Sequence, residues 1–252
     1  MAIPIKNDNQ LTRMREAGHV VAEVFALLKA NIKPGISTRD LERLAVGHMR
    51  KYGAKPSFKG YRDFPGSICT SVNEEVIHGI PGIKKLKSGD IISIDVGVYL
   101  NGFHADAART FPVGDVSPEA LRLITVTRET FYHCIEYAKA GRHLHDISQA
   151  IQQYAEMFGY RVVEEYVGHG VGKDLHEEPQ IPLIKQKNRG PRLCKGMTLA
   201  IEPMVNQGSK EIDTKPDNWT VVTKDGALSA HYENTVLITD GDPEILTTIN
   251  SR

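Results

Sequence analysis

Apolar residues recur at helical spacing in four stretches of the chain, and these stretches predict four helices in two consecutive pairs. The first pair covers residues 11–32 and 38–52, and the second covers residues 117–140 and 146–158. Ser37 and Ser117 precede two of these stretches and are N-cap candidates. Gly53, Gly141 and Gly159 follow three of them and are typical C-terminal stops.

Shorter apolar segments between turn residues predict β-strands. We expect strands at residues 67–72, 161–167, 198–202, 218–222, 230–239 and 244–248. Residues 179–195 are polar and proline-rich, and they predict a loop.

Residues 89–111 predict a β-hairpin that turns at Asn101-Gly102. Asn-Gly between alternating apolar runs is a strong hairpin signal, because both residues accept the positive φ of a tight turn. A two-residue loop at this point sets the register and predicts three opposed pairs: Leu100 with Phe103, Gly97 with Asp106, and Asp95 with Ala108.

Two carboxylates share one face of the predicted hairpin, because side chains alternate along a strand with period two. Asp95 and Asp106 become diagonal neighbours, with Cβ atoms about 7 Å apart, and Gly97 is expected to leave open space between them. Two such groups would repel each other and lose hydration unless a cation lies between them. The alternative is that this face is simply solvated.

A weak internal sequence repeat suggests that the chain contains two related halves. The pattern Lys-x-Gly-x4-Asp occurs at residues 33–40 and again at 139–146, and the segment from Gly89 to Asp95 is similar to the segment from Gly196 to Glu202. We therefore expect a single catalytic domain over residues 1–252, built of halves at about 10–112 and 116–248. The second half should then supply carboxylates of its own.

Three residues of the second half meet that expectation. Glu202 ends one apolar strand and Glu233 lies inside another, while His169 is flanked by glycines at the end of a third. An ion-paired or edge-strand glutamate and a turn with an incidental histidine remain the alternatives when each residue is taken alone. Four carboxylates and one imidazole suit two adjacent divalent ions. Such oxygen-rich ligation favours manganese, iron(II) or cobalt over structural zinc.

Composition narrows the class of protein. The chain has 252 residues, 40% of them hydrophobic, and its 31 basic and 31 acidic residues balance, which gives no electrostatic reason to expect a nucleic-acid partner. Its three cysteines lack CxxC spacing, so we expect no disulfide framework and a cytoplasmic location. No signal-peptide pattern and no membrane span are evident, since no run approaches ~18 apolar residues.

Two longer motifs resemble those of the methionine aminopeptidases. Residues 71–81 read Ser-Val-Asn-Glu-Glu-Val-Ile-His-Gly-Ile-Pro, similar to that family's SVNExxxHGIP signature. Residues 169–179, from His169-Gly170 to Glu178-Pro179, are similar to its GHGxG…HExP signature. The resemblance extends over residues 10–248 and implies an α/β (α+β) fold of the pseudo-twofold pita-bread type, with an antiparallel sheet core covered by two helix pairs. It is closest to the bacterial form of the type I enzymes.

The resemblance also implies roles for individual residues. Two divalent ions, for which cobalt, manganese, iron(II), zinc and nickel are all candidates, would be held by Asp95, Asp106, His169, Glu202 and Glu233. Asp95 would chelate one metal, Asp106 and Glu233 would bridge both, and the remaining two would hold the other. Glu202 would also move a proton from a shared hydroxide to the leaving amine. Catalytic roles at the substrate are implied for His78 and His176, which without the family would be ordinary histidines.

The methionine side chain needs an apolar pocket of limited depth. The resemblance places in that pocket Tyr61, Phe64, Cys69 and Trp219, with Phe58 as a further candidate. Each of these residues could equally belong to an ordinary core. The chain departs from the family at Leu175, where an aromatic is frequent, at His231, where Gln is frequent, and at Asn234, where His is frequent. The side chain of His231 could reach the metal region.

The implied function is removal of N-terminal methionine from peptides and nascent chains, preferentially before a small second residue. The resemblance further implies a cytoplasmic monomer that meets the ribosome only transiently and contacts neither nucleic acid directly nor a membrane. Two alternatives remain open. One is a proline-specific peptidase of the same fold, such as a prolidase or aminopeptidase P, and the other is a non-enzymatic peptide-binding module.

Overall fold

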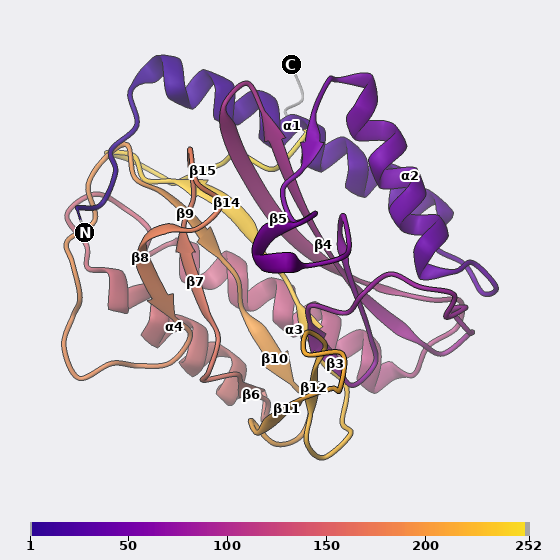
Figure 1. Cartoon of the computed structure of the whole chain (residues 1–252). Coiled ribbons are helices and arrows are strands. Elements are labelled where there is room, and N and C mark those ends of the chain that lie inside the picture. The colour runs from indigo at the N-terminus through magenta and orange to yellow at the C-terminus, as the bar shows by residue number, and fades with distance from the viewer. Residues whose placement is uncertain (1, 250–252) are drawn as a thin grey trace.

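The computed structural model describes residues 2–249 and contains the four expected helices in two pairs (Figure 1). The first pair is α1 (Asp8–Asn31) and α2 (Thr38–Lys51), and the second is α3 (Pro118–Ile135) and α4 (Leu144–Met157). Ser37 and Ser117 cap α2 and α3 as predicted. The third helix ends earlier than predicted, at Ile135, because the chain continues in tight turns such as Ala138 N–H to the Ile135 carbonyl.

The central hairpin has the predicted register. Strands β4 (Ile91–Leu100) and β5 (Phe103–Pro112) pair antiparallel, with Gly97 opposite Asp106 and Asp95 opposite Ala108. Asn101 and Gly102 form the turn with φ of 52° and 87°, which is the backbone conformation that this dipeptide favours. On its other side β4 pairs with β1 (Lys55–Pro56) and β2 (Cys69–Val72).

The second half contributes a five-stranded antiparallel sheet in the order β15-β14-β9-β7-β8. Its strands are β7 (Val167–Gly170), β8 (Glu177–Pro182), β9 (Thr198–Ile201), β14 (Asn234–Leu237) and β15 (Glu244–Ile245). Two three-stranded sheets complete the structure. One contains β6 (Arg161–Val162), β10 (Met204–Asn206) and β13 (Ser229–His231), and the other contains β3 (Glu75–Ile77), β11 (Ile212–Thr214) and β12 (Val221–Thr223).

Several strand predictions were wrong in detail. The segment predicted as a loop at residues 179–195 begins with the second part of β8, which pairs with β7. A proline there is compatible with the sheet because β8 is an edge strand and needs fewer N–H donors. The strand expected at 161–167 contains only the short β6 and the first residue of β7. The strand expected at 230–239 is interrupted after His231, so Glu233 lies between β13 and β14 rather than inside a strand.

The helices cover the sheets from outside, as predicted for an antiparallel core with two helix pairs (Figure 1). Helix α1 packs on β4 and β5, and α2 packs on α1. Helices α3 and α4 pack on each other and on strands of the second half, including β13, β6 and β8. Each half has a large buried apolar cluster. Among residues 2–249, no helix combines the length and the apolar character needed to cross a membrane.

A short seam joins the two halves along β5. Ala108 and Glu233 exchange two backbone hydrogen bonds, of 3.3 and 2.9 Å. The Thr235 hydroxyl accepts from the Asp106 N–H and donates to the Asp106 carbonyl, both at 2.9 Å. These contacts pair Ala108 with Glu233 and Asp106 with Thr235, so Asp106 and Glu233 are near neighbours across the seam although they are far apart in sequence.

Candidate metal centre

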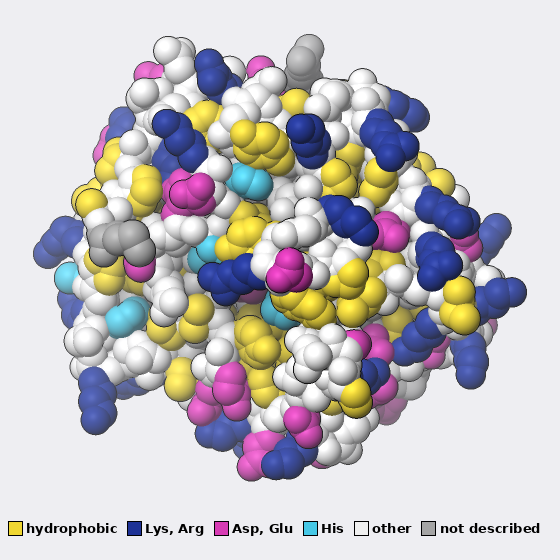
Figure 2. Space-filling model, viewed as in Figure 1, with side chains coloured by type: hydrophobic (Ala, Val, Ile, Leu, Met, Phe, Trp, Pro, Cys, Tyr) yellow, Lys and Arg dark blue, Asp and Glu magenta, His cyan; other side chains and the backbone are white. Residues whose placement is uncertain are grey.

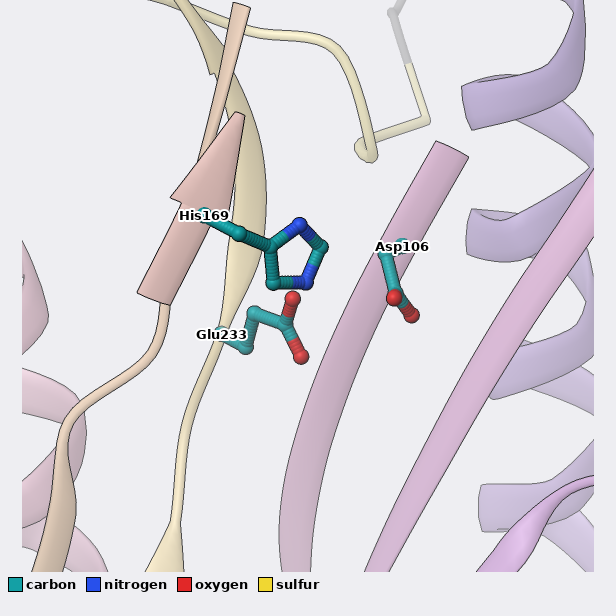
Figure 3. A group of neighbouring side chains, drawn as sticks. All are labelled: Asp106, His169 and Glu233. Carbon is teal, nitrogen blue, oxygen red and sulfur yellow. The ribbon is translucent and has the colours of Figure 1, made fainter. Parts of the chain in front are cut away.

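Side chains from both halves converge next to this seam. Asp95 lies in β4, Asp106 in β5 and His169 in β7, while Glu202 follows β9 and Glu233 precedes β14. One ligand atom each of Asp106, His169 and Glu233 lies within 4.8 Å of the other two. Figure 3 shows these three side chains, with the imidazole and the Glu233 carboxylate facing the strand that carries Asp106. The structure thus brings Asp106 and Glu233 together, although they lie more than a hundred positions apart in the sequence.

The donor set fits a bound cation. Asp106 and Glu233 are 4% and 2% exposed, and one carboxylate oxygen of each has no hydrogen-bond partner among the described residues. The Oδ1 atom of Asp95 is likewise buried and unpartnered. Buried carboxylate oxygens without donors are costly, and a divalent ion is the partner that several of them can share.

The electrostatics agree with this interpretation. Burial raises the pKa of Asp95, Glu202 and Glu233 well above the usual carboxyl range, and the nearby charge of Asp106 raises each pKa further. Burial also raises the pKa of Asp106 to about 7. The four carboxyl groups therefore resist ionising together unless a positive charge is supplied.

His169 is oriented as a metal-ligating imidazole would be. Its Nδ1 lies 2.8 Å from the carbonyl oxygen of Gly170, which leaves Nε2 to face Glu202 Oε1 at 3.7 Å. Burial lowers the pKa of His169 to about 4, so the ring is neutral at physiological pH. A neutral ring whose second nitrogen bonds a backbone carbonyl is the usual form of a histidine ligand.

A second histidine reaches the same carboxylates. His231 Nε2 lies 3.9 Å from Glu202 Oε2 and 3.9 Å from Glu233 Oε2. A second group of candidate ligands accordingly consists of Glu202, His231 and Glu233. The sequence showed His231 as a departure from the family, but it did not include this residue among the metal ligands.

A cavity of about 660 Å³ opens beside the carboxylates. It is lined by all the residues expected to contact substrate: Tyr61, Phe64, Cys69, His78, His176 and Trp219. Phe58, Phe64, Cys69 and Leu175 form one buried apolar cluster, against which Tyr61 and Trp219 pack. Figure 2 shows histidine and hydrophobic side chains near the centre of the corresponding face. A cavity that combines an apolar cluster with convergent polar groups is typical of a small-ligand site.

The two non-ligand histidines line the cavity in different surroundings. His78 directly follows β3 and has φ of 60°, a conformation that costs a non-glycine residue about 1 kcal/mol and that recurs at functional sites. The ring of His176 lies 4.1 Å from that of His169 between centroids, and its Nδ1 is 2.7 Å from the Tyr61 hydroxyl. Burial lowers the pKa of His78 to about 4 and that of His176 to about 3.

The expectation that Gly97 leaves open space between the two aspartates was wrong. A Cβ added at Gly97 would meet the Phe58 ring at 2.6 Å and Ser57 Cβ at 2.8 Å. The segment after β1 therefore covers this face of the hairpin, and the glycine permits its close approach. No sequence pattern indicated this contact, because it joins the hairpin to an irregular segment.

Tyr166 is a cavity residue that the sequence did not reveal. It lines the cavity just before β7, and its ring packs edge-on against that of His78 with centroids 5.6 Å apart. No motif marks this tyrosine. Its proximity to the glycine-flanked His169 was the only signal available.

Known proteins resemble this chain over nearly its whole length. The family model described as Metallopeptidase family M24 matches residues 12–240. A curated methionine aminopeptidase from Clostridium acetobutylicum is 56% identical over 246 residues, which cover 97% of this chain and 98% of that protein. Methionine aminopeptidase 1 from Bacillus subtilis is 55% identical, with 97% and 98% coverage. The crystal structure of a methionine aminopeptidase from Thermotoga maritima matches with a TM-score of 0.96 at 44% identity, covering 98% of this chain and all of that one.

Proposed function

Because the chain belongs to metallopeptidase family M24 and, within it, to the methionine aminopeptidases, we propose that its two halves hold a pair of divalent metal ions between them. It is a metal-dependent hydrolase that removes methionine from the N-terminus of peptides. Its fold is the pita-bread fold expected from the resemblance. The convergence of unpartnered carboxylates from both halves beside one cavity is the observation that carries the proposed ligand assignment.

The proposed ligand set follows the arrangement of the strands. Asp95 would hold one ion from β4, Asp106 and Glu233 would hold both ions across the seam, and His169 and Glu202 would hold the second ion. The short separations among Asp106, His169 and Glu233 support this division, and so does the approach of His169 Nε2 to Glu202. When bound, such ions polarise the scissile carbonyl and lower the pKa of a water molecule.

The remaining chemistry belongs to side chains of the cavity. Glu202 takes the proton of the attacking water and delivers it to the departing amine, a role that its place in the lining of the cavity supports. The Tyr61 hydroxyl lies 2.7 Å from Nδ1 of His176, and when the hydroxyl is the donor the ring proton is on Nε2. His176 then donates that proton in a hydrogen bond to the developing oxyanion. His78, which also lines the cavity, contacts the peptide beside the scissile bond.

We assign methionine specificity to the apolar cluster that lines part of the cavity. Phe58, Phe64, Cys69 and Trp219 form a wall of aromatic and sulfur-containing side chains, which suits an unbranched, polarizable thioether. Burial raises the pKa of the Cys69 thiol well above its usual range, so this residue acts as an apolar wall and not as a nucleophile. A preference for a small second residue completes the proposal, because that residue must fit beside the metal ligands.

The proposed setting is the cytoplasm, where the chain acts as a monomer on nascent proteins during transient encounters with the ribosome. Cys69 and Cys134 are buried and free, and Cys194 is exposed and free. An exposed free thiol is compatible with a reducing compartment.

Peptide hydrolysis tests the proposed function directly. Purified protein should release methionine from Met-Ala-Ser when manganese or cobalt is added, and it should leave Val-Ala-Ser intact. Absence of methionine release with every divalent metal would overturn the assignment. Faster cleavage of Xaa-Pro than of Met-Ala peptides would favour the proline-specific alternative. Peptide binding without any metal by elemental analysis would favour the binding-module alternative.

A further inference from the structure

Glu202 lies between two imidazoles. Its Oε1 faces His169 Nε2 at 3.7 Å, and its Oε2 faces His231 Nε2 at 3.9 Å. The assigned ligand His169 is thus hardly closer to this carboxylate than His231 is. We propose that His231 is a sixth protein ligand of the metal centre and supplies a second imidazole to it. This inference rests on the proposed metal centre and extends it.

The separations suit a shared ion better than hydrogen bonds. His231 Nε2 lies 3.9 Å from one oxygen of Glu202 and 3.9 Å from one oxygen of Glu233, which is beyond hydrogen-bond range. Metal–ligand bonds of ~2.1 Å place two ligand atoms of one ion roughly 3–4 Å apart. An ion between these three atoms would therefore need only small side-chain movements.

The Nε2 atom of His231 also has no hydrogen-bond partner among the described residues that could replace a metal ion. The residue is 2% exposed, and its Nε2 is buried without a hydrogen-bond partner among residues 2–249. A buried polar atom without a partner carries a free-energy penalty. The free energy of metal coordination would remove that penalty, as it does for the unpartnered carboxylate oxygens beside it.

The backbone holds His231 firmly in this position. Its N–H donates to the Thr110 hydroxyl and its carbonyl accepts from the same hydroxyl, both at 2.9 Å. Its strand β13 also pairs with β10, where His231 lies opposite Met204. These contacts link the residue both to β5, which carries Asp106, and to the strand that follows Glu202. The imidazole is therefore positioned by the same elements that position the carboxylates.

A second imidazole changes the metals that the centre prefers. Imidazole suits iron, cobalt, nickel and zinc, whereas an all-oxygen environment suits manganese. Replacing His231 with glutamine keeps a polar side chain of moderate size but removes the basic nitrogen. We expect H231Q to lose at least tenfold in cobalt affinity, and to lose less in manganese affinity, by calorimetric titration.

Proton NMR of the cobalt-loaded protein counts the imidazoles independently of activity. A cobalt-bound histidine gives a strongly shifted, exchangeable ring N–H signal. We expect two such signals in the wild type, one in H231Q and two in the control H19Q, whose side chain is 47% exposed on α1. A second variant, H231N, should match H231Q. Circular dichroism verifies that each variant is folded.

The outcomes separate this inference from the function on which it rests. A wild-type spectrum with one shifted signal, or an H231Q spectrum identical to it, would overturn the role of His231 while leaving the metal centre intact. A wild-type protein that binds no cobalt would overturn the metal centre itself. Equal losses of cobalt and manganese affinity in H231Q would contradict imidazole ligation and indicate that the residue only supports the carboxylates.

Discussion

Asp106 lies at the seam, and its buried Oδ1 has no partner among the described residues. Replacing it with asparagine removes a charge that repels three neighbouring carboxylates and removes a bridging ligand. We expect D106N to lose at least ~10³-fold in kcat, which is comparable to the loss caused by removing a group that stabilises charge in a transition state. The thermal stability of the EDTA-treated variant should equal or exceed that of EDTA-treated wild type, because the repulsion is relieved. Peptide kinetics and thermal unfolding measure both effects.

The control for D106N is D242N, because Asp242 pairs with Lys139 on the surface and its side chain is 90% exposed. We expect this control to retain activity and metal binding. Near-normal turnover in D106N would contradict the ligand assignment. A large loss of stability in the metal-free variant would show instead that Asp106 has a structural role.

Tyr61 provides a second prediction through its 2.7 Å hydrogen bond to His176. The substitution Y61F keeps the ring in the methionine pocket but releases His176 Nδ1. A hydrogen bond of this kind contributes about 1 kcal/mol or slightly more, so kcat should fall about tenfold. The KM for Met-Ala-Ser should change little, because the pocket wall is retained. Steady-state kinetics distinguish the two parameters.

A rise in KM with unchanged kcat would contradict this role for the Tyr61 hydroxyl and would indicate that it binds substrate directly. H176Q supplies the comparison: if the hydroxyl acts only through His176, adding Y61F to H176Q should have almost no further effect. An additional tenfold loss in the double variant would show that the two residues act separately.

At the residue scale, the sequence correctly predicted those positions that are set by the alternation of side chains along a strand. Asp95 and Asp106 were placed correctly on one hairpin because a single turn fixes the register of both. His231 was not among the predicted ligands, because its approach to Glu202 depends on the break between β13 and β14. Tyr166 was missed because its contact with His78 joins two segments that no local pattern connects.

At the element scale, the close approach of the segment after β1 to the β4–β5 hairpin depends on Gly97. An alanine there would place its Cβ 2.6 Å from the Phe58 ring and 2.8 Å from Ser57. Phe58 lines the cavity, so it must shift to accept the methyl group. We expect G97A to lose about 1–3 kcal/mol in the free energy of unfolding and to raise the KM for methionyl peptides several-fold. Denaturant unfolding and kinetics provide the measurements.

Gly47 offers the matched control, because it lies in α2 and an added Cβ meets nothing within 4 Å. G47A should be neutral or stabilising by about 0.5–1 kcal/mol and should leave KM unchanged. If G97A behaved like G47A in both measurements, the segment that carries Phe58 would have to be freely displaceable, and Phe58 could not define the pocket.

The elements also show which sequence signals were reliable. Helix caps and the Asn-Gly turn are local features, and they correctly predicted where α2 and α3 begin and how the hairpin pairs. Strand β8 was missed because its prolines indicated a loop, although an edge strand tolerates residues without an N–H donor. Short strands such as β6 and β15 depend on pairing partners distant in sequence. Their bounds therefore could not be read from local composition.

At the scale of the whole molecule, the proposed ligands come from both sides of one seam. Reciprocal hydrogen bonds between Ala108 and Glu233, and those of Thr235 with Asp106, hold the halves together where the carboxylates crowd. This arrangement places mutual repulsion of the carboxylates at the junction itself. Metal binding should consequently act on the stability of the entire chain and not on one half.

Thermal unfolding with and without metal tests that coupling and the single-domain prediction together. A ligand that binds only the folded state at 100 times its Kd stabilises it by about 2.7 kcal/mol, or roughly 5–10 °C in Tm for a chain of this size. We expect manganese or cobalt to raise the Tm of EDTA-treated protein by such an amount within one cooperative transition, and to leave the Tm of D106N almost unchanged. Two separate transitions in EDTA would contradict a single domain, because they would show that each half folds alone. A metal-induced shift confined to one of two transitions would place all the ligands in that half, against the seam geometry.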